Sequence, residues 1–85
     1  MILDLYTIQE LSSLHRQTGQ YVAAMYARTI KLTYEMGTVT DADTYAGLRG
    51  VREVVFAAAR EAEELMVEIG AEMKARDYRD APDGH

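Results

Sequence analysis

Apolar residues recur at steps of three and four along most of the chain, which is the spacing of one face of an α-helix. The first such series, with one threonine included, runs through Leu11, Leu14, Thr18, Tyr21, Val22, Met25, Leu32 and Met36. Gly19 interrupts the composition of this segment but not the phase of its apolar face. The pattern therefore predicts one helix over about residues 7–36, with a break at Gly19 as the alternative.

The start of this helix carries two sequence signals. Thr7 and Glu10 have the spacing of a capping box, in which the side chain of each residue bonds the backbone amide of the other. Tyr6 and Leu11 have the spacing of a hydrophobic staple, an apolar contact that fixes where the chain enters the helix. Both signals predict a helix that starts at Thr7.

Residues 37–40 predict a tight turn. Gly37 is expected in the left-handed conformation that often ends helices, and Thr40 or Asp41 is expected to cap the next helix. A second apolar series then runs through Leu48, Val51, Val55, Ala58, Ala59, Ala62, Leu65, Met66, Ile69 and Met73. This series predicts a second helix over about residues 41–78, followed by a flexible tail at residues 79–85.

These elements predict an all-α fold in which two long antiparallel helices form a helical hairpin, as one domain over residues 1–78. Each helix of such a layer can bury one stripe against the other. The first helix has a second apolar stripe on its opposite side: Ala23, Tyr26, Ala27, Ile30 and Tyr34. We expect this stripe to form an interface in a homodimer that is a four-helix bundle. The alternative is that Met1–Leu5 folds back and covers it.

The chain has 85 residues, no cysteine and a net charge of -5. Without cysteines there are no disulfides or thiolate metal ligands, and we expect a cytoplasmic protein. No apolar run approaches the roughly 20 residues of a membrane span, so no membrane partner is expected. The acidic balance also argues against direct nucleic-acid binding, which normally requires a basic surface.

Charge is distributed unevenly along the predicted hairpin. Residues 22–60, around the turn, contain five cations and four anions, whereas the rest of the chain contains four cations and ten anions. Antiparallel pairing of two hairpins would set unlike ends together, which favours that orientation. The acidic end is also a candidate docking surface for a basic protein, including one that normally binds nucleic acid.

A row of carboxylates follows one side of the second helix: Glu61, Glu64, Glu68 and Glu72. Such a row could hold Mg²⁺ or, with ligands from a facing helix, two metal ions. The fragment Glu61-x-x-Glu64 also fits part of the Glu-x-x-Glu pattern of all-helical nucleotide pyrophosphohydrolases, but the first helix has no matching acidic pair. A solvated flank with ion pairs such as Glu72–Arg76 is the favoured interpretation, and no metal or cofactor is expected.

The second helix also carries a cationic patch around its one phenylalanine, at helical spacing: Arg49, Arg52, Phe56 and Arg60. This patch could bind an anionic partner or stack a base. Arginine stems that cover an exposed ring are the simpler interpretation. His15 lies on the core-facing side of the first helix and is expected to bond a glutamate of the second.

The sequence contains neither a nucleophile elbow nor a glycine-rich phosphate loop, so no catalytic residues are expected. The features together favour a small non-enzymatic interaction module, a homodimeric helical hairpin that binds a partner protein and regulates or inhibits it. Two alternatives stay open. One is an acidic inhibitor of the kind that phages encode, which occupies the nucleic-acid site of a host factor. The other is a carboxylate-rich bundle with a metal or nucleotide-hydrolase site.

Overall fold

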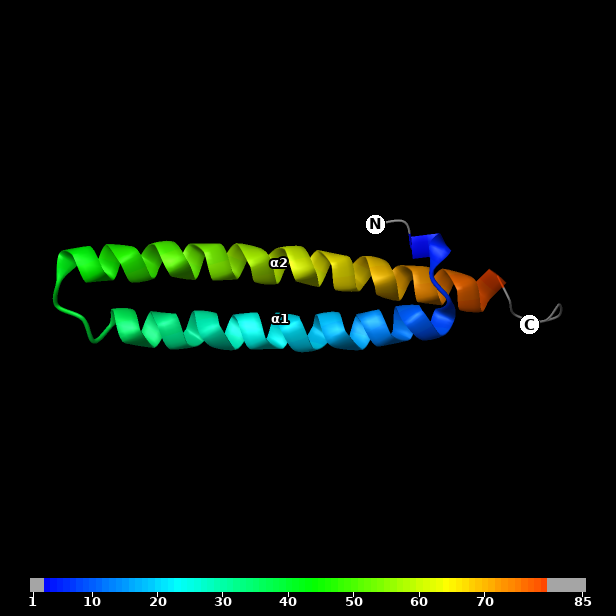
Figure 1. Ribbon diagram of the computed structural model, residues 1–85, viewed down its shortest axis with the longest axis horizontal. Coiled ribbons are helices and arrows are strands. Elements are labelled where there is room, and N and C mark those ends of the chain that lie inside the picture. The colour runs from blue at the N-terminus through cyan, green and yellow to red at the C-terminus, as the bar shows by residue number, and fades with distance from the viewer. Residues whose placement is uncertain (1–2, 80–85) are drawn as a thin grey trace.

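The computed structural model describes residues 3–79 and consists mainly of two long antiparallel helices (Figure 1). A 3-10 helix, η1 (Leu3–Leu5), precedes α1 (Ile8–Met36), and α2 (Ala42–Arg79) follows after a short turn. The predicted all-α hairpin is confirmed, and α1 continues through Gly19 without a break. Of the predicted tail, residues 80–85 lie outside the described part of the chain.

Both helices begin at a capping side chain. The hydroxyl of Thr7 accepts a hydrogen bond from the Glu10 amide at 3.1 Å, and the Thr7 amide donates to the Glu10 carboxylate at 2.9 Å. At the start of α2, the carboxylate of Asp41 accepts hydrogen bonds from the amide and the hydroxyl of Thr44, both at 2.8 Å. These bonds satisfy amides that the first turn of a helix leaves without a partner.

The end of α1 differs from the prediction. Gly37 has φ −71° and ψ −15°, which lies in the right-handed helical region, so the expected left-handed conformation is wrong. Its amide donates to the carbonyl oxygens of Thr33 and Tyr34 at 3.3 and 3.1 Å, and the Thr38 amide donates to that of Glu35 at 3.0 Å. The last turn of α1 tightens, as helix ends often do, and satisfies these carbonyl groups without a left-handed residue.

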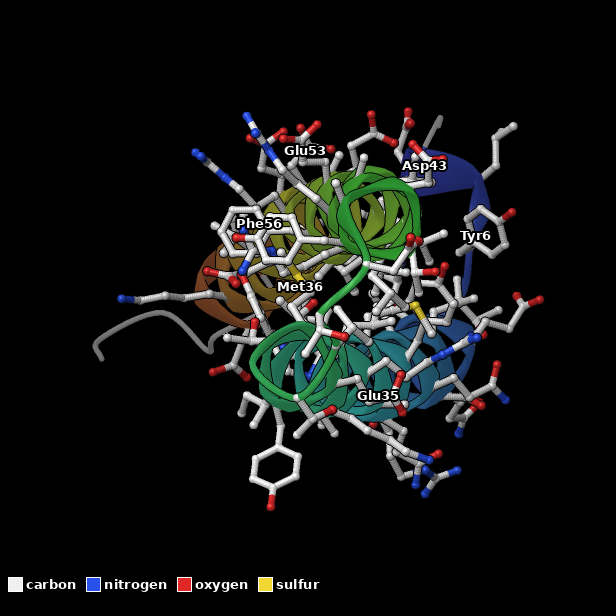
Figure 2. The ribbon with its side chains drawn as sticks, turned by 90° about the vertical axis from the view of Figure 1, so that its left-hand side faces the viewer. Tyr6, Glu35, Met36, Asp43, Glu53 and Phe56 are labelled. Atoms are coloured by element: carbon white, nitrogen blue, oxygen red, sulfur yellow. The ribbon has the colours of Figure 1, made fainter. Side chains whose placement is uncertain are left out.

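The core is a single row of side chains between the two helices. The buried apolar residues are Leu11, Val22, Met36, Val55, Ala59 and Ile69. Figure 2 looks along the helices and shows Met36 between them. Tyr21 and Val51 were predicted in the same stripes but are 47% and 49% exposed. They lie at the edges of the contact, because two packed helices cover a narrower strip than each apolar stripe spans.

Two glycines of the interface lie beside large side chains of the opposite helix. A Cβ atom on Gly19 would lie 3.4 Å from the sulfur of Met66, and one on Gly70 would lie 3.5 Å from Nε2 of His15. The His15 ring therefore packs over the backbone of α2 at Gly70. These two contacts pair a large residue with a small one and allow the helix axes to approach.

The segment before α1 is held against the far end of α2. The guanidinium group of Arg76 donates hydrogen bonds to the carbonyl oxygen of Leu3, at 2.8 Å, and to that of Tyr6. The same group pairs with Glu72 at 2.9 Å.

Among residues 3–79, no helix is both long enough and apolar enough to cross a membrane.

We predict that Thr7→Ala lowers the free energy of unfolding by about 1 kcal/mol at neutral pH, because it removes the hydroxyl of the capping box. The Glu10 carboxylate of the capping box makes the free energy of unfolding depend on pH. Hydrogen bonds from the backbone and then the side chain of Thr7 lower the pKa of Glu10. The stability that this carboxylate contributes is therefore present above its ordinary pKa and lost as pH falls through the lowered one.

Urea unfolding followed by circular dichroism at several pH values measures both effects. The difference in unfolding free energy between the wild type and Glu10→Gln should be present at neutral pH and disappear in acid. Glu61→Gln removes the same charge from an exposed position in the middle of α2 and serves as the control. A Glu10→Gln difference that persists unchanged in acid would contradict this assignment.

Candidate interaction surface

Tyr26 of α1 and Phe56 of α2 meet on one side of the two-helix layer. Their ring centroids lie 6.0 Å apart with the ring planes at 73°, an edge-to-face arrangement that aromatic pairs favour. The Tyr26 hydroxyl also donates a hydrogen bond to the carboxylate of Glu63 at 2.7 Å. These contacts tie the two helices together along one edge of their interface.

Beside this pair, α1 exposes large apolar side chains. Ile30 and Tyr34 are 72% and 76% exposed, and the smaller Ala23 and Ala27 are exposed as well. Ala23 and Ile30 lie three and four residues from Tyr26 and share its side of α1, and Ala27 and Tyr34 continue the stripe at steps of four from those two. We define the aromatic face as Ala23, Tyr26, Ala27, Ile30, Tyr34 and Phe56.

Arginines of α2 border the aromatic face. Arg52 donates a hydrogen bond to the hydroxyl of Thr33 across the helix interface at 3.3 Å, and Arg49 pairs with Glu53 at 3.4 Å. A hollow of about 300 Å³ lies between the helices here, lined by Thr29, Thr33, Arg52, Glu53 and Phe56. The contact between Tyr26 and Phe56 therefore joins the second apolar stripe to the cationic patch, which the sequence presented as separate surfaces.

The described part of the N-terminal segment does not cover this surface. Figure 2 shows Tyr6, which follows η1, on the opposite side of the two-helix layer from Phe56. The alternative in which Met1–Leu5 folds over the second stripe is therefore wrong for Leu3–Leu5, which Arg76 holds against the other side of α2. Residues 1–2 lie outside the described part of the chain.

The four carboxylates of the predicted row lie in two different environments. Glu61, Glu64 and Glu68 are exposed, whereas Glu72 is partly buried in its pair with Arg76. A hollow of about 390 Å³ on this part of α2 is lined by Arg60, Glu63, Glu64, Val67 and Glu68. Within residues 3–79, no group of three or more histidine, aspartate or glutamate side chains is placed to hold a metal ion. Glu61, Glu64 and Glu68 are thus exposed charges on the surface of α2.

The sequence did not single out Glu63, although a signal for it exists. Glu63 lies seven residues after Phe56, which is close to two helical turns, so both face the same side of α2. The partner of Glu63 on α1 depends on how the two helices are rotated against each other, which neither helix reveals alone.

A scan against protein-family models, a search of curated proteins and a search of solved structures each found no match to this chain.

The contact between Tyr26 and Glu63 predicts a measurable titration. The hydrogen bond to the carboxylate raises the pKa of Tyr26, because it stabilises the neutral phenol beside a negative charge. The stability that the bond contributes is present below the ordinary tyrosine pKa and is lost as pH rises through the raised one. Titration followed by phenolate absorbance should show one late step, which Tyr26→Phe removes and Glu63→Gln shifts to lower pH.

Glu61→Gln, which removes a carboxylate two residues away, is the control for this titration and should leave the late step in place. The assignment is contradicted if Glu63→Gln and Glu61→Gln have the same effect on that step.

Proposed function

We propose that this protein is a non-enzymatic interaction module: a helical hairpin that pairs with a second copy through the aromatic face and binds and regulates a partner protein. The exposure of Ile30 and Tyr34 beside the Tyr26–Phe56 pair carries the proposal. Monomeric soluble proteins rarely leave a contiguous apolar patch in water unless it serves as a binding surface. Aromatic residues are also enriched in the cores of protein interfaces.

The shape of the single chain supports pairing. The Cα radius of gyration is 18.5 Å, whereas a compact domain of this length has about 12 Å. The accessible surface is 6455 Å², about 1,400 Å² more than expected for a compact monomer of this mass. A standard protein interface buries about 1,600 Å² in total. Pairing through the aromatic face would therefore remove surface of the size that the extended shape leaves exposed.

The acidic half of the hairpin supports a basic partner protein. This half, residues 1–21 and 61–85, contains ten of the fourteen anions of the chain. Glu61, Glu64 and Glu68 are exposed on it, so their field reaches into solvent and attracts a positively charged surface. A homodimer presents two such halves, and simultaneous binding of both raises the overall affinity for a partner with two sites.

Paired substitutions at equally exposed valine and isoleucine positions test the interface. Ile30 is 72% exposed on the aromatic face, and Val54 is 70% exposed at a position of α2 outside that face. Light scattering should give the wild type a mass near twice 9.5 kDa. Ile30→Asp should give a single chain, because it places a charge in an apolar contact, and Val54→Asp should remain a dimer.

A folded, helical wild type with the mass of a single chain at high concentration would refute the homodimer. Equal loss of assembly in both variants would refute the aromatic face as its interface. The partner is sought by affinity capture with the wild type and with a variant that carries Glu61→Gln and Glu68→Gln. Equal capture by this variant, or capture indifferent to salt, would remove the role given to the acidic half.

A further inference from the structure

Phe56 lies at the centre of a stripe of alternating charges on α2. The stripe follows helical steps of four, three, four and four along Arg49, Glu53, Phe56, Arg60 and Glu64. Its four charged residues are all exposed. If a second copy of the stripe is turned end for end about Phe56, its Arg49 lies opposite Glu64 of the first copy. Its Glu53 then lies opposite Arg60 of the first copy. The stripe is therefore complementary in charge to a reversed copy of itself.

The α1 residues of the aromatic face are also complementary to a reversed copy of themselves, in side-chain size rather than in charge. Ala23, Ala27, Ile30 and Tyr34 follow steps of four, three and four. Reversal about the midpoint of this series sets Tyr34 against Ala23 and Ile30 against Ala27. Each large side chain then meets a small one, which lets two helices pack closely.

The centres of these two series lie at one level of the hairpin. The midpoint on α1 falls between Ala27 and Ile30. Phe56 packs against Tyr26 with centroids 6.0 Å apart and lines a hollow together with Thr29, so it lies beside that midpoint. A single two-fold axis can therefore pass through both centres, as a symmetric interface requires, because each patch must meet its own copy.

We propose that two copies pair end for end about a two-fold axis that crosses the aromatic face at the level of Phe56. In this dimer, α1 lies antiparallel on the partner's α1, and α2 lies antiparallel on the partner's α2. Arg49 faces Glu64 of the partner subunit, and Arg60 faces Glu53 of the partner subunit. This inference rests on the proposed homodimer and specifies how its two copies are oriented.

The other closed arrangement has its two-fold axis along the helices, with the two turns together. It would set Ile30 and Tyr34 of α1 against the charged stripe on α2 of the second copy. It would also place the acidic halves side by side, and like charges in contact oppose association. End-for-end pairing avoids both costs, because apolar residues meet apolar residues and the acidic halves extend from opposite ends.

This geometry leaves the outer ends of the acidic halves available. The axis lies in the half of the hairpin near the turn, so the four helices overlap mainly there. Because α2 begins 14 residues before Phe56, the two α2 helices overlap over residues 42–70, and residues 71–79 of each copy extend beyond the overlap at the two ends of the dimer.

Charge reversal with mixing tests the predicted contacts between copies. Arg60→Glu would face Glu53 of the partner subunit, and Glu53→Arg would face Arg60 of the partner subunit. Each variant alone should raise the dissociation constant of the dimer by about tenfold or more, because both symmetric contacts become repulsive. A one-to-one mixture of the two variants should restore dimerisation, since both contacts then join opposite charges. Arg28→Glu, an equal reversal at an exposed position on another side of α1, should leave the dissociation constant unchanged.

The orientation is measured with a spin label at Thr40→Cys, which introduces the one cysteine of the chain. α2 begins at Ala42, 14 residues before Phe56, so the turn lies about 21 Å beyond the axis in each copy and the two labels should be about 40 Å apart at 1.5 Å per residue. Turns placed together would bring them to roughly 10 Å, the spacing of packed helices. A dimer with that short distance, or without rescue on mixing, overturns the axis and leaves the homodimer standing. A wild type that stays monomeric overturns both.

Discussion

Two helices packed side by side can bury only the side chains that point at the neighbouring helix. In this protein that contact is a single row, from Leu11 and Ile69 at one end to Met36 near the turn. Every other apolar position of α1 and α2 must meet the N-terminal segment, another molecule or water. Leu3–Leu5 lie on one side of the layer, held by Arg76, and leave the aromatic face on the other side uncovered.

The contacts within the aromatic face suit it to assembly. The edge-to-face pair of Tyr26 and Phe56 and the bond from Tyr26 to Glu63 fix the two helices against each other, so the face has a defined arrangement in the single chain. A preorganised surface loses less conformational freedom on binding than a mobile one. The charges around Phe56 add direction, because charge complementarity selects orientation more than it adds affinity.

Features that depend on neighbours along the chain could be predicted from the sequence, as the capping box of Thr7 shows. Features that depend on the rotation of one helix against the other could not. Both Tyr26 and Phe56 were recognised as surface residues, but their contact needed the relative placement of α1 and α2. The exposure of Tyr21 has the same cause, because the width of the buried row is set by the packing of the pair. Gly37 was misassigned because glycine permits a left-handed turn without requiring one.

The concentration dependence of thermal unfolding tests most directly whether the hairpin depends on a second copy. Circular dichroism melts at protein concentrations from about 1 to about 100 µM compare the midpoint under otherwise identical conditions. If the aromatic face is buried by another copy, the midpoint rises by several degrees across this range, because dimerisation stabilises only the folded chain. A helical protein whose midpoint is the same at every concentration would show that the two-helix layer is stable alone, which contradicts this account.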